Sequence, residues 1–437
     1  MTPVPPNDRR LAASSPEAAL LAAYDLFRDT ADLSRVFALV LFLVSSSVTR
    51  PETRRAFAEP DAFQEILRAA VPTDAAPLVP AWQDMRPEAV RQLVQAVGRT
   101  VAAAGAGPTF QSVLSRYAAA AGRRSLWTPT SSAVAALLAR LIASESATTV
   151  YDPACRAGEL LIEVARRGGP SQVSVRAVTR HRESRALSQA ALDVHGITSE
   201  ISQSEYPWLS THEAFSRVVC NPPFSLRLPE ESVPDAWSSA LPPSRADFIW
   251  LLHAKESLEP GGIAAVLMPH GTLFRRGKEE ELRKKLIDDE VVEALVVLPA
   301  QMLPEAGIPT VVWLLRPRGE SRREVLFVDA SALGTLTDRT HRTFDERESS
   351  AVVELVERWR ATGAVTDPGL GISVPRTQIR AADYLLIPAH YRPEPSPDDV
   401  PGAAALEEIM ARLRSAEAGA EAADTEARRL LEGLRWQ

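Results

Sequence analysis

The stretch Asn221-Pro222-Pro223-Phe224 offers unusual chemistry for a loop. The apolar run Val218–Cys220 before it predicts a short buried strand. The two prolines end that strand, because neither can donate to a ladder of hydrogen bonds. The loop therefore presents carbonyl oxygens and a side-chain amide, while two backbone N–H groups are missing. A planar amino group, which has two hydrogens to donate, would find acceptors in Asn221 Oδ1 and the Pro222 carbonyl.

The aromatic ring of Phe224 could stack on a ring that carries such an amine. These features together fit an adenine base that has been flipped out of its duplex. A proline-rich turn with a buried phenylalanine is the alternative interpretation, and the loop by itself favours neither. Open α/β sheets bind ligands at the carboxyl ends of their strands, so the neighbouring elements decide what this loop can do.

A second candidate site is the turn Asp152–Gly158, which lies between a predicted strand at 148–151 and a predicted helix at 160–167. A turn of small residues between strand and helix is how α/β folds cradle a nucleotide-like ligand. This turn is poor in glycine for that task. Before it, Thr128 is predicted to cap a helix that begins at Pro129.

The next predicted strand, at 173–178, ends at Thr179, where many cofactor folds place a carboxylate for ribose hydroxyls. Further elements are predicted as helices at 183–194, 248–258 and 277–287 and as strands at 263–268, 291–298, 310–315 and 325–328. Strands that alternate with helices predict an α/β fold, with a mostly parallel sheet covered by helices on both faces. We expect a helical domain at 1–121, the α/β domain at 122–343, and an extension at 344–437 with a terminal helix or helical hairpin.

Composition narrows the class of protein. The chain has 437 residues, 45% of them hydrophobic, and a net charge of −7, so no global field draws it onto nucleic acid. Local basic patches or a partner would have to make any DNA contact. The densest basic region, 275–285, is interpreted as a solvated helix face in preference to a phosphate-binding surface. Two cysteines give neither a disulfide framework nor zinc spacing, which favours a cytoplasmic setting. The longest apolar run, 36–44, is too short to span a bilayer, and the first residues lack the signal-peptide pattern.

Several blocks in one order resemble the adenine-specific (N-6) DNA methyltransferases, most closely the modification (M) subunits of type I restriction–modification systems. The resemblance covers about residues 124–316. The blocks are Trp127-Thr128-Pro129, Asp152-Pro153-Ala154-Cys155, Asn221-Pro222-Pro223-Phe224, Leu258–Gly262 with Met268–Gly271, Leu298-Pro299 and Gly307–Thr310.

The resemblance implies a Rossmann-like, S-adenosylmethionine-dependent methyltransferase fold, with a seven-stranded sheet whose one antiparallel strand lies near 310–315. It implies methyl transfer from S-adenosyl-L-methionine to the exocyclic amine of adenine in DNA, for restriction–modification or phage defence. The implied catalytic residues are Asn221, Pro222, Pro223 and Phe224. The implied cofactor-binding residues are Trp127, Thr128, Pro129, Asp152, Pro153, Ala154, Cys155, Arg156, Gly158 and Thr179, and no metal is expected. DNA and a specificity subunit are the expected partners, with a restriction subunit as a further candidate and no membrane.

Three positions depart from the family pattern, and one of them is Ser216, where an acid is expected shortly before the catalytic loop. Arg156 stands where the family has a glycine, and Thr179 stands where it has the acid that holds ribose. A charged hydrogen bond contributes about 1.5–3 kcal/mol, so loss of the acid would weaken cofactor binding roughly tenfold to a hundredfold. One alternative is therefore a catalytically degenerate relative that binds DNA or a partner subunit. Another is methylation of a glutamine amide in a protein.

Overall fold

The computed structural model describes residues 24, 25, 27, 33–59, 86–121, 129–143, 148–168, 173–210, 213–238, 246–303, 307–337 and 341–392, together with 407, 410, 411 and 414. The chain divides into two compact units, Met1–His390 and Tyr391–Gln437, and every element below belongs to the first. The predicted terminal helix or hairpin falls almost wholly outside the described residues.

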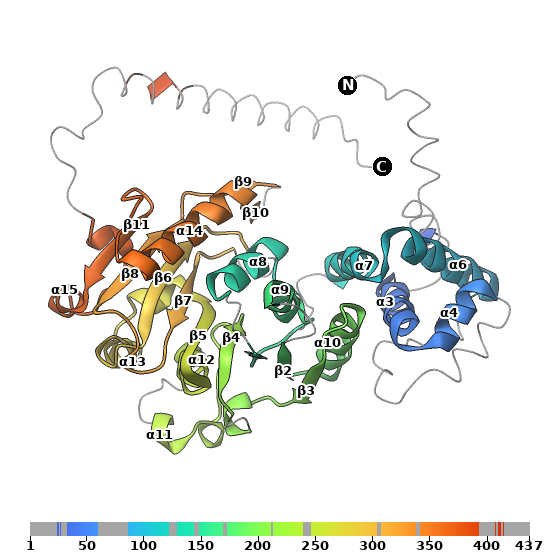
Figure 1. Ribbon diagram of the computed structural model, residues 1–437, viewed down its shortest axis with the longest axis horizontal. Helices are drawn as coiled ribbons and strands as arrows, with labels where there is room; N and C mark the ends of the chain where they lie inside the picture. The colour runs from blue at the N-terminus through green and yellow to red at the C-terminus, as the bar shows by residue number, and fades with distance from the viewer. Residues whose placement is uncertain are drawn as a thin grey trace, which may run out of the picture. The chain divides into compact units, whose positions relative to one another are not determined.

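A mixed sheet of nine strands forms the centre of the first unit (Figure 1). Across the sheet the strands are β11 (Gly371–Pro375), β8 (Glu324–Asp329), β6 (Val292–Leu298), β7 (Thr310–Leu315), β5 (Leu258–Pro269), β4 (Phe215–Cys220), β1 (Thr149–Asp152), β2 (Ser174–Thr179) and β3 (Ser199–Gln203). Strand β7 runs antiparallel to β5 and β6, as the resemblance implied, but β11 also runs antiparallel to its neighbour β8, so the expectation of a single antiparallel strand was wrong. The expected number of seven strands was wrong, because β8 and β11 extend the sheet beyond β6.

Helices cover both faces of this sheet. The main ones are α8 (Ser132–Leu141), α9 (Glu159–Gly168), α10 (Arg182–Val194), α12 (Asp247–Glu256), α13 (Lys278–Asp288) and α14 (Glu346–Thr362). Alternate residues of each strand point to opposite faces. Val219 of β4 joins the core cluster that contains side chains of α8, α9, α10 and α14. On the other face, the Phe248 ring of α12 meets the Trp313 ring of β7 at a centroid distance of 6.0 Å.

Before α8, the described part of the chain forms the helices α3 (Leu33–Thr49), α4 (Pro51–Ala58), α6 (Pro87–Ala104) and α7 (Ala106–Ala121). The apolar run 36–44 lies within α3 and is buried throughout, as expected of a core helix. The Tyr117 hydroxyl of α7 donates to Glu183 Oε1 of α10 at 2.7 Å, which joins these helices to the sheet layer. In the described ranges no single helix is long and apolar enough to cross a membrane. One pair of helices in those ranges, Val36–Thr49 and Pro51–Ala58, is together long and apolar enough for a span, but the two are bent by 116° relative to each other.

The smaller elements lie in the connections between these layers. They are η4 (Pro207–Leu209), η5 (Glu230–Ser232), α11 (Asp235–Ser238), η6 (His270–Leu273), α15 (Arg376–Ala381), η7 (Pro388–His390) and the hairpin of β9 (Thr335–Leu336) with β10 (Arg342–Thr343).

Two predicted element boundaries were wrong. Helix α8 begins at Ser132 with Ser131 at its N-cap, three residues after the predicted start at Pro129. The segment Pro260-Gly261-Gly262, expected to follow the helix at 248–258, lies inside β5. Strand β5 tolerates the segment because its register with β4 shifts beside it, between Phe215 and Arg217.

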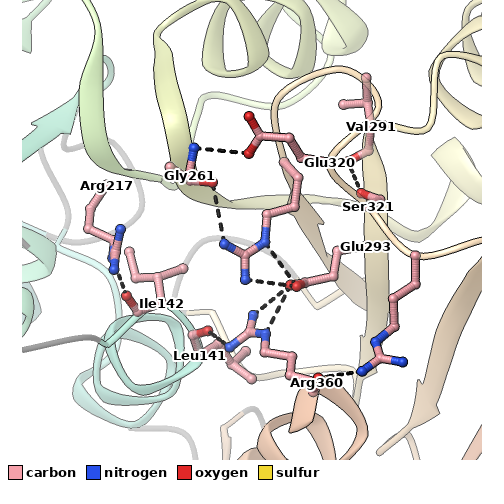
Figure 2. A network of polar contacts seen from close by, with 12 residues as sticks. Leu141, Ile142, Arg217, Gly261, Val291, Glu293, Glu320, Ser321 and Arg360 are labelled. Atoms are coloured by element: carbon pink, nitrogen blue, oxygen red, sulfur yellow. Dashed lines mark hydrogen bonds and ion pairs between the residues drawn. The ribbon is translucent and has the colours of Figure 1, made fainter. Parts of the chain in front are cut away.

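A buried ion-pair network lies at the amino end of β6, the opposite edge of the sheet from the candidate site (Figure 2). Glu293 of β6 accepts from Arg316, directly after β7, at 2.8 Å and from Arg360 of α14 at 2.7 Å. Arg360 Nη1 also donates to the Leu141 carbonyl at the end of α8 at 2.7 Å. The network thus connects one strand, the end of another and two helices that are far apart in the sequence.

Candidate active site

Three of the predicted site segments meet at the carboxyl ends of neighbouring parallel strands. Asn221 follows β4, Asp152 ends β1 and Thr179 ends β2. Strand β1 pairs with β4 on one side and with β2 on the other. After β1 the chain builds β2 and β3 on one side, then crosses to place β4 on the other side. The position between β1 and β4 is therefore the topological switch point, where α/β sheets of this kind bind ligands.

Asn221 is the best-defined polar group at this switch point. Its side chain is buried, with 2% of the residue exposed. Nδ2 donates to Thr130 Oγ1 at 2.9 Å. Oδ1 is buried and has no hydrogen-bond partner among the residues that the structure describes. A buried acceptor without a partner costs about 1–3 kcal/mol, so Oδ1 is prepared to accept a hydrogen bond from a ligand.

The loop after Asn221 is held by a buried acid, Asp247. Pro222 is buried, Pro223 and Phe224 are half-buried, and Ser225 adopts the left-handed region at φ 55°. The Ser225 N–H donates to Asp247 Oδ1 at 2.6 Å, which stabilises a conformation that is unfavourable for a residue with a Cβ. Phe224 packs against the core cluster.

Asp247 is in turn fixed by an arginine from the loop after β5. Arg275 Nη1 lies 3.3 Å from Asp247 Oδ2, and its guanidinium also pairs with Glu279 at 3.6 Å. The guanidinium lies so close to Gly271 that a Cβ on this glycine would come within 2.6 Å of Arg275 Cζ. Gly271 therefore leaves the space in which Arg275 reaches Asp247.

The turn after β1 is buried and tied to its neighbours. Asp152 Oδ1 accepts from the Ala154 N–H at 2.9 Å, and burial raises the pKa of this carboxyl well above its usual range. The Cys155 N–H donates to the Val178 carbonyl of β2 at 2.9 Å. The Cys155 thiol lies 3.3 Å from Ser188 Oγ of α10, and burial raises its pKa well above the usual value. Pro153 and Ala154 are buried as well.

Glu159, the first residue of α9, organises the end of this turn. Its Oε1 accepts from the Thr130 N–H at 2.8 Å and its Oε2 from the Ala157 N–H at 3.2 Å. Gly158 has a left-handed backbone at φ +80°. Arg156 is half-buried, and it has no positive φ.

The four remaining predicted cofactor positions give a mixed result. Thr179 is fully buried, and its hydroxyl donates to the Ser202 carbonyl at 3.3 Å, so the end of β2 presents no carboxylate. Pro129 is half-buried. Trp127 and Thr128 lie outside the described residues.

Thr130, Glu159 and Asp247 were not among the predicted site residues. Thr130 and Asn221 are 91 positions apart, and Ser225 and Asp247 are 22 apart, so no local spacing could reveal these contacts. One weak signal existed for Glu159. An acidic residue in the first turn of a helix favours bonds to free backbone N–H groups.

The interpretation of residues 275–285 as a solvated helix face was wrong for its arginines at 275 and 283. Arg283 is 2% exposed and donates to the backbone carbonyls of Tyr384, Thr272 and Arg275. Lys284 pairs with Glu280 at 2.9 Å. Much of this basic charge is therefore neutralised or used within the fold.

This sheet order, with its loops at the switch point, defines a Rossmann-like α/β methyltransferase. The same fold is found in the methyltransferase subunit of a type I restriction–modification system from Streptococcus thermophilus, with a TM-score of 0.68 and 20% identity, covering 87% of this chain and 99% of that one. The chain belongs to the N-6 DNA Methylase family, whose profile matches residues 106–399.

Two relatives are methylase subunits of type I restriction enzymes. The HindI methylase subunit of Haemophilus influenzae is 26% identical over 348 residues, which cover 76% of this chain and 78% of that subunit. The MpnII methylase subunit of Mycoplasma pneumoniae is 29% identical over 252 residues, which cover 52% of this chain. The chain spans 46% of the MpnII subunit's length.

Proposed function

We propose that this chain transfers a methyl group from S-adenosyl-L-methionine to the exocyclic amine of adenine in DNA, as the modification subunit of a restriction–modification or phage-defence system. The observation that carries the proposal is the buried Asn221 Oδ1, which lacks a partner beside the switch point. Membership of the N-6 DNA Methylase family supports adenine in DNA as the substrate.

The residues of the loop after β4 would act on the amine by position. Asn221 Oδ1 and the Pro222 carbonyl each accept one amine hydrogen, which fixes the direction of the nitrogen lone pair. Phe224 is proposed to stack on the base. S-adenosylmethionine, when bound, supplies a methyl group on a sulfonium that is already a good leaving group. The chain's contribution is therefore alignment of the amine more than removal of its proton.

The residues between β1 and α9 fit this cofactor at one end. Gly158 provides the left-handed corner at the start of α9, and the buried turn 152–158 lies beside the Asn221 acceptor. The ribose end fits less well, because Thr179 is buried and its hydroxyl is used within the sheet. We expect the turn to hold the cofactor, but with lower affinity than a carboxylate at position 179 would give.

The proposal includes DNA and a specificity subunit as partners. The net charge is −7, and two of the arginines in the densest basic region bind carboxylates or carbonyls of the chain itself. DNA attraction and sequence reading would then come largely from another subunit. A restriction subunit is a further candidate partner.

Replacement of Asn221 tests the proposal directly. We expect Asn221→Ala to abolish N6-methyladenine formation in DNA of cells that express the chain with its neighbouring genes, because the amine loses its side-chain acceptor. The melting temperature should fall by only a few degrees, since the variant loses the single hydrogen bond from Nδ2 to Thr130, while Oδ1 accepts none from the described residues. Parent-level methylation by Asn221→Ala would disprove the role of this residue, and an inactive parent would disprove the activity.

A catalytically silent relative that binds DNA or a partner is the second candidate function. It is favoured by the missing carboxylate at Thr179 and by Arg156 in the turn. Calorimetry with S-adenosylmethionine separates the two candidates. A dissociation constant near micromolar supports the enzyme, whereas about millimolar or weaker binding supports the silent relative.

A further inference from the structure

We propose that Thr130 is a positioning residue for the amine site and holds the Asn221 side-chain amide with Oδ1 free to face the substrate. This inference rests on the proposed adenine methylation. Thr130 lies just before α8, in a segment 91 residues away from Asn221, and both residues are buried. Its Oγ1 accepts from Asn221 Nδ2 at 2.9 Å.

The two ends of an asparagine amide have opposite hydrogen-bonding chemistry. The oxygen accepts two hydrogen bonds, and the nitrogen donates two. A substrate amine also donates hydrogen bonds. If the Nδ2 end of Asn221 pointed at the amine, two donors would face each other and no hydrogen bond could form. Because Thr130 engages Nδ2, the polar end left for a ligand is Oδ1, which is the buried atom that has no partner.

Thr130 can do this because its own backbone is fixed from two sides. Its N–H donates to Glu159 Oε1 at 2.8 Å. The next residue, Ser131, donates its hydroxyl to the Met302 carbonyl after β6 at 2.8 Å. The hydroxyl of Thr130 is thus presented by contacts to the start of α9 and to the loop after β6.

Glu159 also connects the amine site to the turn that is proposed to hold the cofactor. The same carboxylate that holds Thr130 accepts from the Ala157 N–H in that turn at 3.2 Å. The orientation of Asn221 is therefore supported through a chain of three hydrogen bonds that begins at Ala157 in the turn and passes through Glu159 and Thr130. Thr130 and Glu159 are assigned positioning roles: both act through Asn221 and are not expected to contact the substrate or the cofactor.

Two substitutions at position 130 separate a positioning role from a packing role. Thr130→Val keeps the shape of the side chain and removes the hydroxyl, whereas Thr130→Ser keeps the hydroxyl and removes a methyl group. We expect Thr130→Val to lower kcat for DNA methylation about tenfold or more, as the loss of one buried hydrogen bond would do. KM for S-adenosylmethionine should change less than about twofold, and Thr130→Ser should retain parent-like kcat.

A second measurement does not depend on activity. The chain contains two asparagines, Asn7 and Asn221. Labelling with [15N]asparagine should therefore give two side-chain amide signals by NMR, and an Asn7→Gln variant assigns them. In the parent, the Asn221 amide should exchange its protons slowly, because it is buried and donates to Thr130. Thr130→Val should shift this signal and speed the exchange, while Thr130→Ser should preserve both.

The outcomes are distinguishable. If the parent methylates no DNA, the proposed function fails, yet the amide signals still report whether Thr130 holds Asn221. The positioning role is overturned if Thr130→Val leaves kcat and the Asn221 signal unchanged. It is equally overturned if Thr130→Ser lowers kcat as much as Thr130→Val, since packing would then explain both.

Discussion

Within the turn after β1, the backbone distinguishes Gly158 from Arg156, which stands where the family has a glycine. Gly158 has φ +80°, which a residue with a Cβ adopts only at a cost. Arg156 lies outside the positive-φ region, so an arginine there adds no backbone strain of that kind. A glycine at 156 would serve mainly to let the backbone approach a ligand.

We therefore predict that Arg156→Gly tightens the binding of S-adenosylmethionine, by about tenfold if the side chain now obstructs the turn. Isothermal titration calorimetry of parent and variant measures this directly. An unchanged dissociation constant would show that Arg156 is not an obstacle. Weaker binding would show instead that the guanidinium pairs with the carboxylate of the cofactor.

At the residue scale the sequence predicted the groups that lie on one continuous segment. Asn221 and the turn at 152–158 were identified because their motifs are local, and they do meet at one edge of the sheet. Thr130 and Asp247 were missed because contacts with segments distant in the sequence define each of them. The stacking role of Phe224 stays a prediction.

At the scale of elements, the loop after β4 depends on two neighbours that follow it in the chain. Asp247 at the start of α12 receives the Ser225 N–H, and Arg275 after β5 pairs with Asp247. Gly271 leaves the space for Arg275. This contact gives a physical reason for the glycine at position 271, because a side chain at that position would displace the guanidinium of Arg275.

We predict that Gly271→Ala lowers kcat by roughly tenfold to a hundredfold, since a small misplacement of a positioned group is costly. The added Cβ would come within 2.6 Å of Arg275 Cζ and push the guanidinium away from Asp247. Steady-state methylation of DNA gives kcat, and circular dichroism verifies that the fold is retained.

The matched control for Gly271→Ala uses the residue that it displaces. Arg275→Ala alone should lower kcat to a similar extent. In the Arg275→Ala background, Gly271→Ala should have almost no further effect, because the clash has lost its partner. Additive losses in the double variant would mean that the alanine acts through another contact.

The boundaries of elements show where local propensity was insufficient. The strand at 310–315 was predicted with the bounds that the structure has, because it is a continuous apolar run and is buried on both faces. The start of α8 was misplaced because Pro129 resembles a first helical residue, yet the helix is capped at Ser131. Pro260 and the two glycines after it were placed outside a strand, because pairing with β4 cannot be deduced from composition.

For the whole molecule, the alternation of strands and helices was enough to predict the fold class. Strand β8 follows from its apolar run, but β11 does not, since its residues are only partly buried and form no apolar run. Strand β11 adds residues 371–375 to the sheet as an edge strand beside β8. The proposed domain boundaries at 121 and 343 remain predictions.

The ion-pair network around Glu293 governs a property of the whole molecule, its stability against acid (Figure 2). Burial alone would raise the pKa of Glu293, but Arg360 and Arg316 outweigh burial and hold it below the ordinary 4.5. A depressed pKa in the folded state stabilises the fold at pH values above the unfolded pKa. The stabilisation is lost as the pH falls through the folded pKa.

We predict that Glu293→Gln lowers the free energy of unfolding at pH 7 by about 3 kcal/mol, because it leaves two arginines without their buried carboxylate. Urea denaturation at a series of pH values measures the difference from the parent. The difference in unfolding free energy between parent and variant should be constant from pH 7 down to about pH 5. It should narrow below the ordinary glutamate pKa of about 4.5, where Glu293 of the parent begins to take up a proton and lose its charge.

As a control, Glu320→Gln should change stability by less than about 0.5 kcal/mol, since among the described residues this exposed carboxylate receives only the Gly261 N–H. An equal loss for Glu293→Gln at pH 7 and at acidic pH would show that packing of the side chain, and not its charge, stabilises this edge of the sheet.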